Sequence, residues 1–166
     1  MKQKLSLVGF VAIAVACALI PNRSNAGNAE ERQLETPPVS TGIDERLSFY
    51  MNRLADSSYV GTYGDAENVH TWYAAAEELG RIGAPALAPL IERVVTTRNE
   101  YERRLGIYAL RLAAQDPLIR LELRIAMPEY PQALPAPDEQ PRIVGLWVQW
   151  WLTHRSVIEA AIRQDD

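Results

Sequence analysis

Apolar side chains recur every three or four residues along most of the chain, which is the spacing of one face of an α-helix. The first segment of this kind carries Ile43, Leu47 and Leu54 on one face. We predict six helices, over about residues 43–55, 68–82, 85–97, 100–115, 117–126 and 142–163. An alternation of apolar and polar residues over the length of a strand is not found, so the predicted fold class is all-α.

Glycine, proline and capping residues mark the points where the predicted helices end and begin. Gly83 suits a left-handed helix end, and Pro85 then falls in the first turn of the next helix. Asn99 can cap the following helix, and Asp116, which precedes a proline, can start the one after it. Five prolines in residues 128–141 exclude a helix there and indicate an extended connection.

The last predicted helix, at about 142–163, contains three of the four tryptophans. Trp147 and Trp151 lie at the centre of its apolar stripe, whereas Trp150 is rotated by about 60° to one side of Trp147. We therefore expect Trp150 to be partly exposed and available to a partner. The pattern leaves open whether this helix caps the rest of the fold or forms an interface.

The run A-A-E-E-L-G-R-I-G-A-P-A-L-A-P-L-I at residues 75–91 resembles a HEAT repeat of the short bacterial, lyase-associated kind. A less regular copy follows at about 102–117, with a period of 31 or 33 residues. The resemblance covers about residues 68–126 and implies a short α-solenoid, in which each HEAT-like helical hairpin buries its apolar face against the next. On this interpretation the helices at about 43–55 and 142–163 are flanking capping helices.

Residues 1–26 have the features of a secretory signal peptide. A cationic start precedes an apolar run that is short for a membrane span, and small residues stand before a predicted cleavage site after Ala26. An uncleaved anchor and a lipoprotein modified at Cys17 are the alternatives. We expect a periplasmic or secreted protein, with residues 27–40 as a disordered leader and 41–166 as a single helical domain.

Charge limits what can bind the mature chain. Residues 27–166 contain 14 arginines, no lysine and 21 acidic residues, which gives a net charge of −7. That balance disfavours nucleic-acid binding, because such a site needs a positive field to displace counterions from phosphates. After signal cleavage no apolar stretch approaches the length of a membrane span. We therefore expect neither a nucleic-acid partner nor a membrane partner.

Few residues can support catalysis. The two histidines are His70 and His154, and the sequence has none of the common hydrolase, metalloprotease or phosphate-loop motifs. Asp65, Glu67 and His70 form the one cluster with mixed metal-ligand chemistry, which would suit an envelope metal-dependent hydrolase. The alternative is that these carboxylates stand at the start of a helix and satisfy its free amide groups. We expect no cofactor.

These observations favour a non-enzymatic protein-binding module or adaptor of the cell envelope, in its most specific form an inhibitor or immunity-type protein. Its expected partner is another protein. The second helices of α-solenoid hairpins line the concave face, which places Glu92, Arg93, Arg120 and Arg124 there. Arginine suits such an interface because its planar guanidinium can pair with a carboxylate through two hydrogen bonds. Trp150 completes the predicted partner-binding set.

Overall fold

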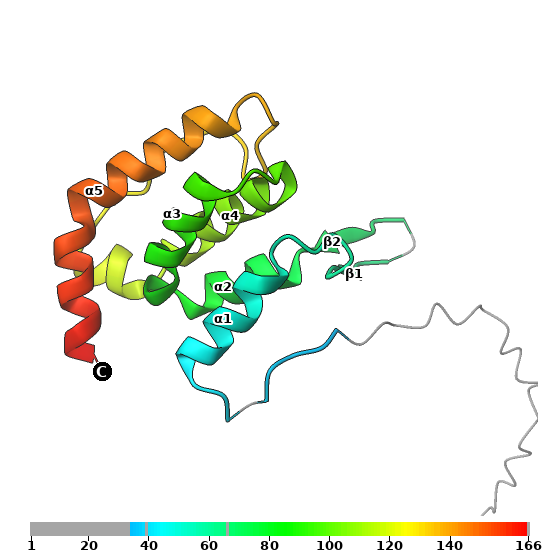
Figure 1. The fold of residues 1–166 in the computed structure, drawn as a ribbon, viewed down its shortest axis with the longest axis horizontal. Coiled ribbons are helices and arrows are strands. Elements are labelled where there is room, and N and C mark those ends of the chain that lie inside the picture. Colours follow the sequence, from blue (N-terminus) through cyan, green and yellow to red (C-terminus); the bar gives the residue numbers. More distant parts are fainter. Residues whose placement is uncertain (1–33, 39, 66, 166) are drawn as a thin grey trace, which may run out of the picture. The chain divides into compact units, whose positions relative to one another are not determined.

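Residues 34–38, 40–65 and 67–165 are described by a computed structural model of the chain (Figure 1). The chain divides into two units, Met1–Glu31 and Arg32–Asp166, and all the described residues belong to the second. The predicted signal peptide and its cleavage site therefore lie outside the described residues, as does the first half of the predicted leader.

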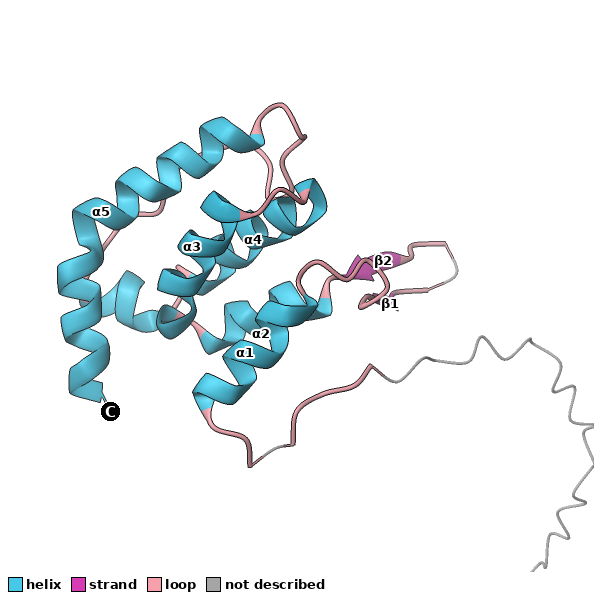
Figure 2. Ribbon diagram, viewed as in Figure 1, coloured by secondary structure: helices cyan, strands magenta, loops and turns pink. Residues whose placement is uncertain are grey.

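The described part of the chain is mostly helical, as expected for an all-α protein (Figure 2). Its elements are α1 Ile43–Arg53, β1 Gly61–Tyr63, β2 His70–Trp72, α2 Ala74–Ile82, η1 Ala84–Ala86, α3 Leu87–Thr96, α4 Glu100–Ala113, η2 Leu118–Glu122 and α5 Gln140–Asp165. Helix α4 packs against both α2 and α3, α1 packs against α2, and α5 packs against α3 and α4. None of the described helices combines the length and the apolar character that a bilayer span requires.

Helix α4 approaches its two neighbours closely because a glycine stands at each contact. A β-carbon at Gly80 of α2 would lie 2.4 Å from Cβ of Leu112 on α4. A β-carbon at Gly106 of α4 would lie 2.5 Å from Cγ1 of Val94 on α3. The largest fully buried apolar side chains of the described residues are Leu54, Leu79, Leu87, Leu90, Val94, Ile107, Leu110, Ile119, Ile143, Trp147 and Ile158.

The turn between α2 and α3 has the predicted geometry. Gly83 adopts a φ of 77°, in the left-handed region that glycine favours, and Pro85 lies in η1, the short 3₁₀ turn that leads into α3. The predicted cap of α4 is also confirmed. The Asn99 side chain accepts hydrogen bonds from the backbone N–H groups of Tyr101 and Glu102. Local sequence chemistry therefore sets the ends of these helices.

The prediction of a helix from about residue 68, with no strand nearby, is wrong. His70–Trp72 forms β2, which pairs antiparallel with β1, so α2 begins only at Ala74. Thr71 and Trp72 are residue types that favour a strand. The loop before them reverses the chain with the help of Gly64, whose φ is 110°. Strands of three residues are too short to produce a clear alternating pattern.

The predicted helix at 117–126 is wrong beyond its first turn. Only Leu118–Glu122 is helical, as the single π-helical turn η2, and Arg124 follows it with a φ of 54°. Pro128 is one of several prolines in the next segment, which disfavour helical backbone in themselves and in the residues before them. The chain therefore reaches α5 through an extended connection that starts earlier than predicted, near Ile125.

Trp150 is buried, so the expectation of a partly exposed ring is wrong. Its exposed fraction is 7%, compared with 0% for Trp147 and 7% for Trp151. The Trp150 indole N–H donates a 2.7 Å hydrogen bond to the carbonyl oxygen of Ala126, on the extended connection. Trp150 lies beside the main apolar stripe of α5, and the extended connection contacts α5 on that side. Helical spacing alone does not predict this contact.

The described end of the predicted leader contacts the helical body. Residues 34–38 contain no helix or strand. The Tyr59 hydroxyl donates a hydrogen bond to the carbonyl oxygen of Glu35, and the Arg53 guanidinium pairs with the Glu35 carboxylate at 2.5 Å. Leu34 also packs against the core. These contacts connect the segment before α1 to the end of α1 and the loop after it.

Candidate functional site

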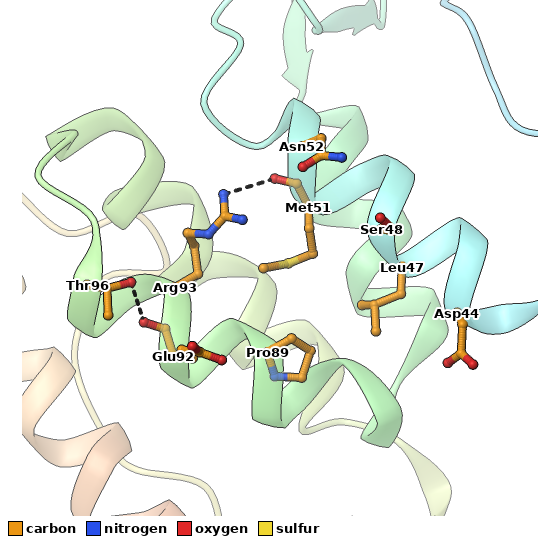
Figure 3. Close-up of a pocket in the computed structure, with 9 residues that line it drawn as sticks. All are labelled: Asp44, Leu47, Ser48, Met51, Asn52, Pro89, Glu92, Arg93 and Thr96. Atoms are coloured by element: carbon orange, nitrogen blue, oxygen red, sulfur yellow. Dashed lines mark hydrogen bonds between the residues drawn. The ribbon is translucent and has the colours of Figure 1, made fainter.

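A surface groove with a volume of about 470 Å³ lies between α1 and α3 (Figure 3). It is lined by Asp44, Leu47, Ser48, Met51, Asn52, Pro89, Glu92, Arg93 and Thr96. This α1–α3 groove contains Glu92 and Arg93, two of the predicted partner-binding residues. The residues of its other wall, on α1, do not belong to that predicted set.

Helical spacing explains how two helices supply these side chains. On α1, Asp44, Leu47 and Met51 are three and four residues apart and so lie on one face. On α3, Pro89 and Glu92 are three residues apart in the same way. Asp44 and Glu92 come from opposite walls, and the apolar side chains lie between them (Figure 3). The groove therefore combines an apolar strip with a carboxylate on each side.

The Arg93 guanidinium is engaged within the chain. It pairs with the Glu102 carboxylate at 2.6 Å and donates a 3.4 Å hydrogen bond to the carbonyl oxygen of Met51, near the end of α1. Glu102 is buried and also accepts a hydrogen bond from the Thr97 hydroxyl. A buried carboxylate is stable only when it is paired, and a cation is favourable at a helix C-terminus. Arg93 thus joins α1, α3 and α4.

The carboxylates of Asp44 and Glu92, unlike that of Glu102, have no cationic partner within the described residues. Both residues are exposed. Because Glu102 balances the charge of Arg93, two unpaired carboxylates determine the charge of the α1–α3 groove, which is therefore acidic.

A second surface pocket, with a volume of about 660 Å³, lies where α4 and η2 meet the extended connection. It is lined by Arg111, Arg120, Ala126, Met127, Pro128, Glu129, Tyr130 and Pro131. We refer to it as the Arg111–Tyr130 pocket. Its charge differs from that of the α1–α3 groove, because two arginines and one glutamate line it.

Aromatic side chains of α5 fix the wall of the Arg111–Tyr130 pocket. The Trp147 indole N–H donates a 3.3 Å hydrogen bond to the Tyr130 hydroxyl, and the Trp150 indole N–H donates one to the carbonyl oxygen of Ala126. The Arg111 guanidinium carbon lies 5.3 Å from the centre of the Tyr130 ring, within the range of a cation–π contact. Burial raises the pKa of the Tyr130 phenol, although the Trp147 hydrogen bond and the Arg111 charge oppose the rise.

The structure does not bring the five predicted partner-binding residues together. Glu92 and Arg93 line the α1–α3 groove, whereas Arg120 lines the Arg111–Tyr130 pocket. Arg124 is exposed on the chain just after η2 and belongs to neither set of lining residues, and Trp150 is buried behind the connection. Sequence reasoning missed the contribution of α1 to the groove and of Arg111 to the pocket. The apolar and acidic spacing of α1 is the signal that could have indicated the first.

The β1–β2 hairpin does not assemble Asp65, Glu67 and His70 into a metal site. Among the residues that the structure describes, no group of three histidine, cysteine or acidic side chains is placed to hold a metal ion. One Asp65 carboxylate oxygen accepts hydrogen bonds from the backbone N–H groups of Glu67 at 3.1 Å and Asn68 at 2.8 Å. His70 stacks on Tyr63, with ring centres 5.2 Å apart. Asp65 therefore stabilises the hairpin loop.

Comparisons with known proteins do not indicate a function, so a functional proposal depends on the fold and the two pockets. No protein-family model, no curated protein and no solved structure matches the chain. The HEAT-like resemblance accordingly rests on the sequence of residues 75–91, which belong to α2, η1 and α3 and to the turn between them.

Proposed function

We propose that the protein is a non-enzymatic protein-binding module of the cell envelope, whose α1–α3 groove holds a basic, partly apolar segment of another protein. The observation that carries the proposal is the pair of unpaired carboxylates, Asp44 and Glu92, on opposite sides of an apolar strip. A partner segment with a lysine or arginine beside an apolar side chain would complement both features.

A HEAT-like scaffold is part of this proposal. The chain turns at Gly83 between α2 and α3, and α4 packs against both of these helices. If α4 is the first helix of a second HEAT-like hairpin, the second helix of that hairpin would lie beside α3 and α4. Helix α5 packs against these two helices after a long connection, which supports assigning it that place. Helix α1 packs on α2 at the other end and supplies one wall of the groove.

Charge complementarity supports a basic partner. The whole chain has a formal charge of −4, and the part after the predicted cleavage site has 14 arginines against 21 acidic residues. Such a field accelerates the association of a basic protein and disfavours acidic competitors. An inhibitor or immunity-type role would use the same surface, with a basic region of an exported toxin or hydrolase as its target.

The test is affinity capture on the purified protein, with charge reversals on the groove. Envelope proteins are passed over immobilised wild type, Asp44→Lys and Glu92→Lys, and the retained proteins are identified by mass spectrometry. Glu45→Lys is the matched control, because Glu45 is an exposed acid in the same first turn of α1 but does not line the groove.

The proposal expects one protein with a basic segment that binds wild type and Glu45→Lys and is lost from both groove variants. A synthetic peptide of that basic segment should then compete with the intact partner. Equal capture by all four forms of the protein, or capture that depends on no basic segment, would contradict the proposal.

A further inference from the structure

We infer that the Arg111–Tyr130 pocket is a second binding site, which takes an extended acidic segment of a protein partner through a carboxylate held between Arg111 and Arg120. The α1–α3 groove is acidic and is suited to a basic segment. A pocket of opposite charge elsewhere on the domain would make the protein an adaptor with two different specificities.

Two unpaired cations carry the argument. Arg111 comes from α4 and Arg120 from η2, and both line the same pocket. Neither guanidinium takes part in an ion pair with another residue of the described ranges. Glu129 is the single acidic residue among those that line the pocket. Two arginines against one glutamate give this pocket a positive charge in an otherwise acidic chain, which makes an external carboxylate favourable there.

Arg111 is held in position before any ligand binds. Its guanidinium lies over the Tyr130 ring, and the Tyr130 hydroxyl is fixed in turn by the indole N–H of Trp147. Trp147 is fully buried, so the base of this series of contacts is anchored in the core. A guanidinium that rests on an aromatic ring loses less side-chain entropy on binding a carboxylate than a free one does.

The backbone of the pocket wall favours an extended peptide over a small anion. Within the described residues, the backbone N–H groups of Met127, Glu129 and Tyr130 make no hydrogen bond. The hydrogen bond from Trp150 holds Ala126, just before this stretch. An extended partner can pair with these backbone N–H groups, while apolar side chains such as Met127 contact its own side chains.

Binding can be followed through Trp147. The probe is an acetylated peptide amide of alternating glutamate and leucine, and the control peptide has glutamine in place of glutamate. Because the Trp147 indole N–H bonds to Tyr130, under Arg111, we expect the acidic peptide to shift the indole N–H resonance of Trp147 in ¹H–¹⁵N spectra of the full protein. The glutamine peptide should leave this resonance unchanged.

Variants then test the two arginines. Arg111→Gln and Arg120→Gln should each weaken binding of the acidic peptide by about tenfold or more, as expected for the loss of a charge-assisted hydrogen bond. Arg98→Gln is the matched control, since Arg98 is exposed and does not line the pocket. Arg120 is also exposed, so its substitution leaves the core intact even where Arg111→Gln affects folding.

Several results would overturn the inference. These are no shift at Trp147 with the acidic peptide, equal binding of the glutamine peptide, or affinity that is unchanged in Arg120→Gln. Inorganic phosphate or vesicles of anionic lipid that bind more tightly than the peptide would assign the pocket to a different ligand. Asp44→Lys should bind the acidic peptide like wild type, so failure of this inference and failure of the proposed function are distinguishable.

Discussion

One carboxylate oxygen of Asp116 accepts a 2.9 Å hydrogen bond from the backbone N–H of Ala84, across 32 positions of sequence. The other carboxylate oxygen accepts one from the backbone N–H of Leu118, also at 2.9 Å. A single side chain thus joins the turn between α2 and α3 to the start of η2. The local prediction that Asp116 caps the next helical turn captures only the second of these bonds.

Asp116→Ala should destabilise the fold by about 1–3 kcal/mol, because it leaves the N–H of Ala84, a fully buried residue, without its acceptor. Urea unfolding followed by circular dichroism measures the change. Asp116→Asn keeps one acceptor oxygen and should cost less. Asp138→Ala, at an exposed residue, is the control, and an equal loss in Asp138→Ala and Asp116→Ala would argue against a special role for the Asp116 bonds.

Gly83→Val should destabilise the protein by more than the roughly 1–2 kcal/mol that a β-carbon costs in the left-handed region. The reason is that a β-carbon at Gly83 would also lie 1.9 Å from the Asp116 carboxylate. Gly145→Ala is the matched control. Gly145 lies inside α5 with nothing within 4 Å of a β-carbon, so alanine there should stabilise the helix by up to about 1 kcal/mol. The melting temperature should therefore fall in Gly83→Val and rise in Gly145→Ala, and a change in the same direction for both variants would contradict these expectations.

Replacement of the tryptophans of α5 separates packing from hydrogen bonding. Trp147→Ala should cost about 3–5 kcal/mol, because it empties a large and fully buried site. Trp150→Phe keeps most of the ring volume but removes the donor to Ala126, so its cost should be closer to about 1 kcal/mol. Acrylamide quenching of single-tryptophan variants should find Trp150 nearly as shielded as Trp147. Strong quenching of Trp150 in the free protein would show that the connection does not cover it.

The sequence was informative where a single residue type fixes a local conformation. Glycine at 83 and the amide side chain of Asn99 predict their turn and cap from nearby residues alone. The burial of Trp150 was not predictable in this way, because it depends on how residues after η2 cross α5. The helical wheel contains no information about that crossing.

In the candidate site, too, local features are predictable from the sequence and features that depend on packing between helices are not. Glu92 and Arg93 follow from the spacing of α3, so the sequence placed them correctly on one helix. The pairing of Arg93 with Glu102 depends on how α3 packs against α4, and this packing changes the charge of the groove from mixed to acidic. The contribution of Asp44 depends on where α1 lies. The sequence pattern of α1 predicts only a capping helix, and it contains no signal for the position of α1 beside α3.

Stability should fall when the pH rises above 10, with Tyr59 as one cause. Burial raises the pKa of Tyr59 from 10.0 to about 12, with a smaller contribution from the neighbouring Tyr50. In the unfolded chain the phenol loses its proton near pH 10, and in the folded protein only near pH 12. Between these values ionisation favours the unfolded state, whereas below pH 10 the full contribution of the neutral phenol is present.

Tyr59→Phe tests this assignment through the slope of stability against pH. The variant should be less stable than wild type at pH 8, because it loses the hydrogen bond from the Tyr59 hydroxyl to the carbonyl oxygen of Glu35. Its stability should then decline less steeply between pH 10 and 12, since one ionising group has been removed. Urea unfolding at a series of pH values measures both effects, and Tyr63→Phe, at a ring that is 61% exposed, is the control. An identical slope for wild type and Tyr59→Phe would mean that the hydroxyl of Tyr59 is not held neutral by burial against the segment before α1.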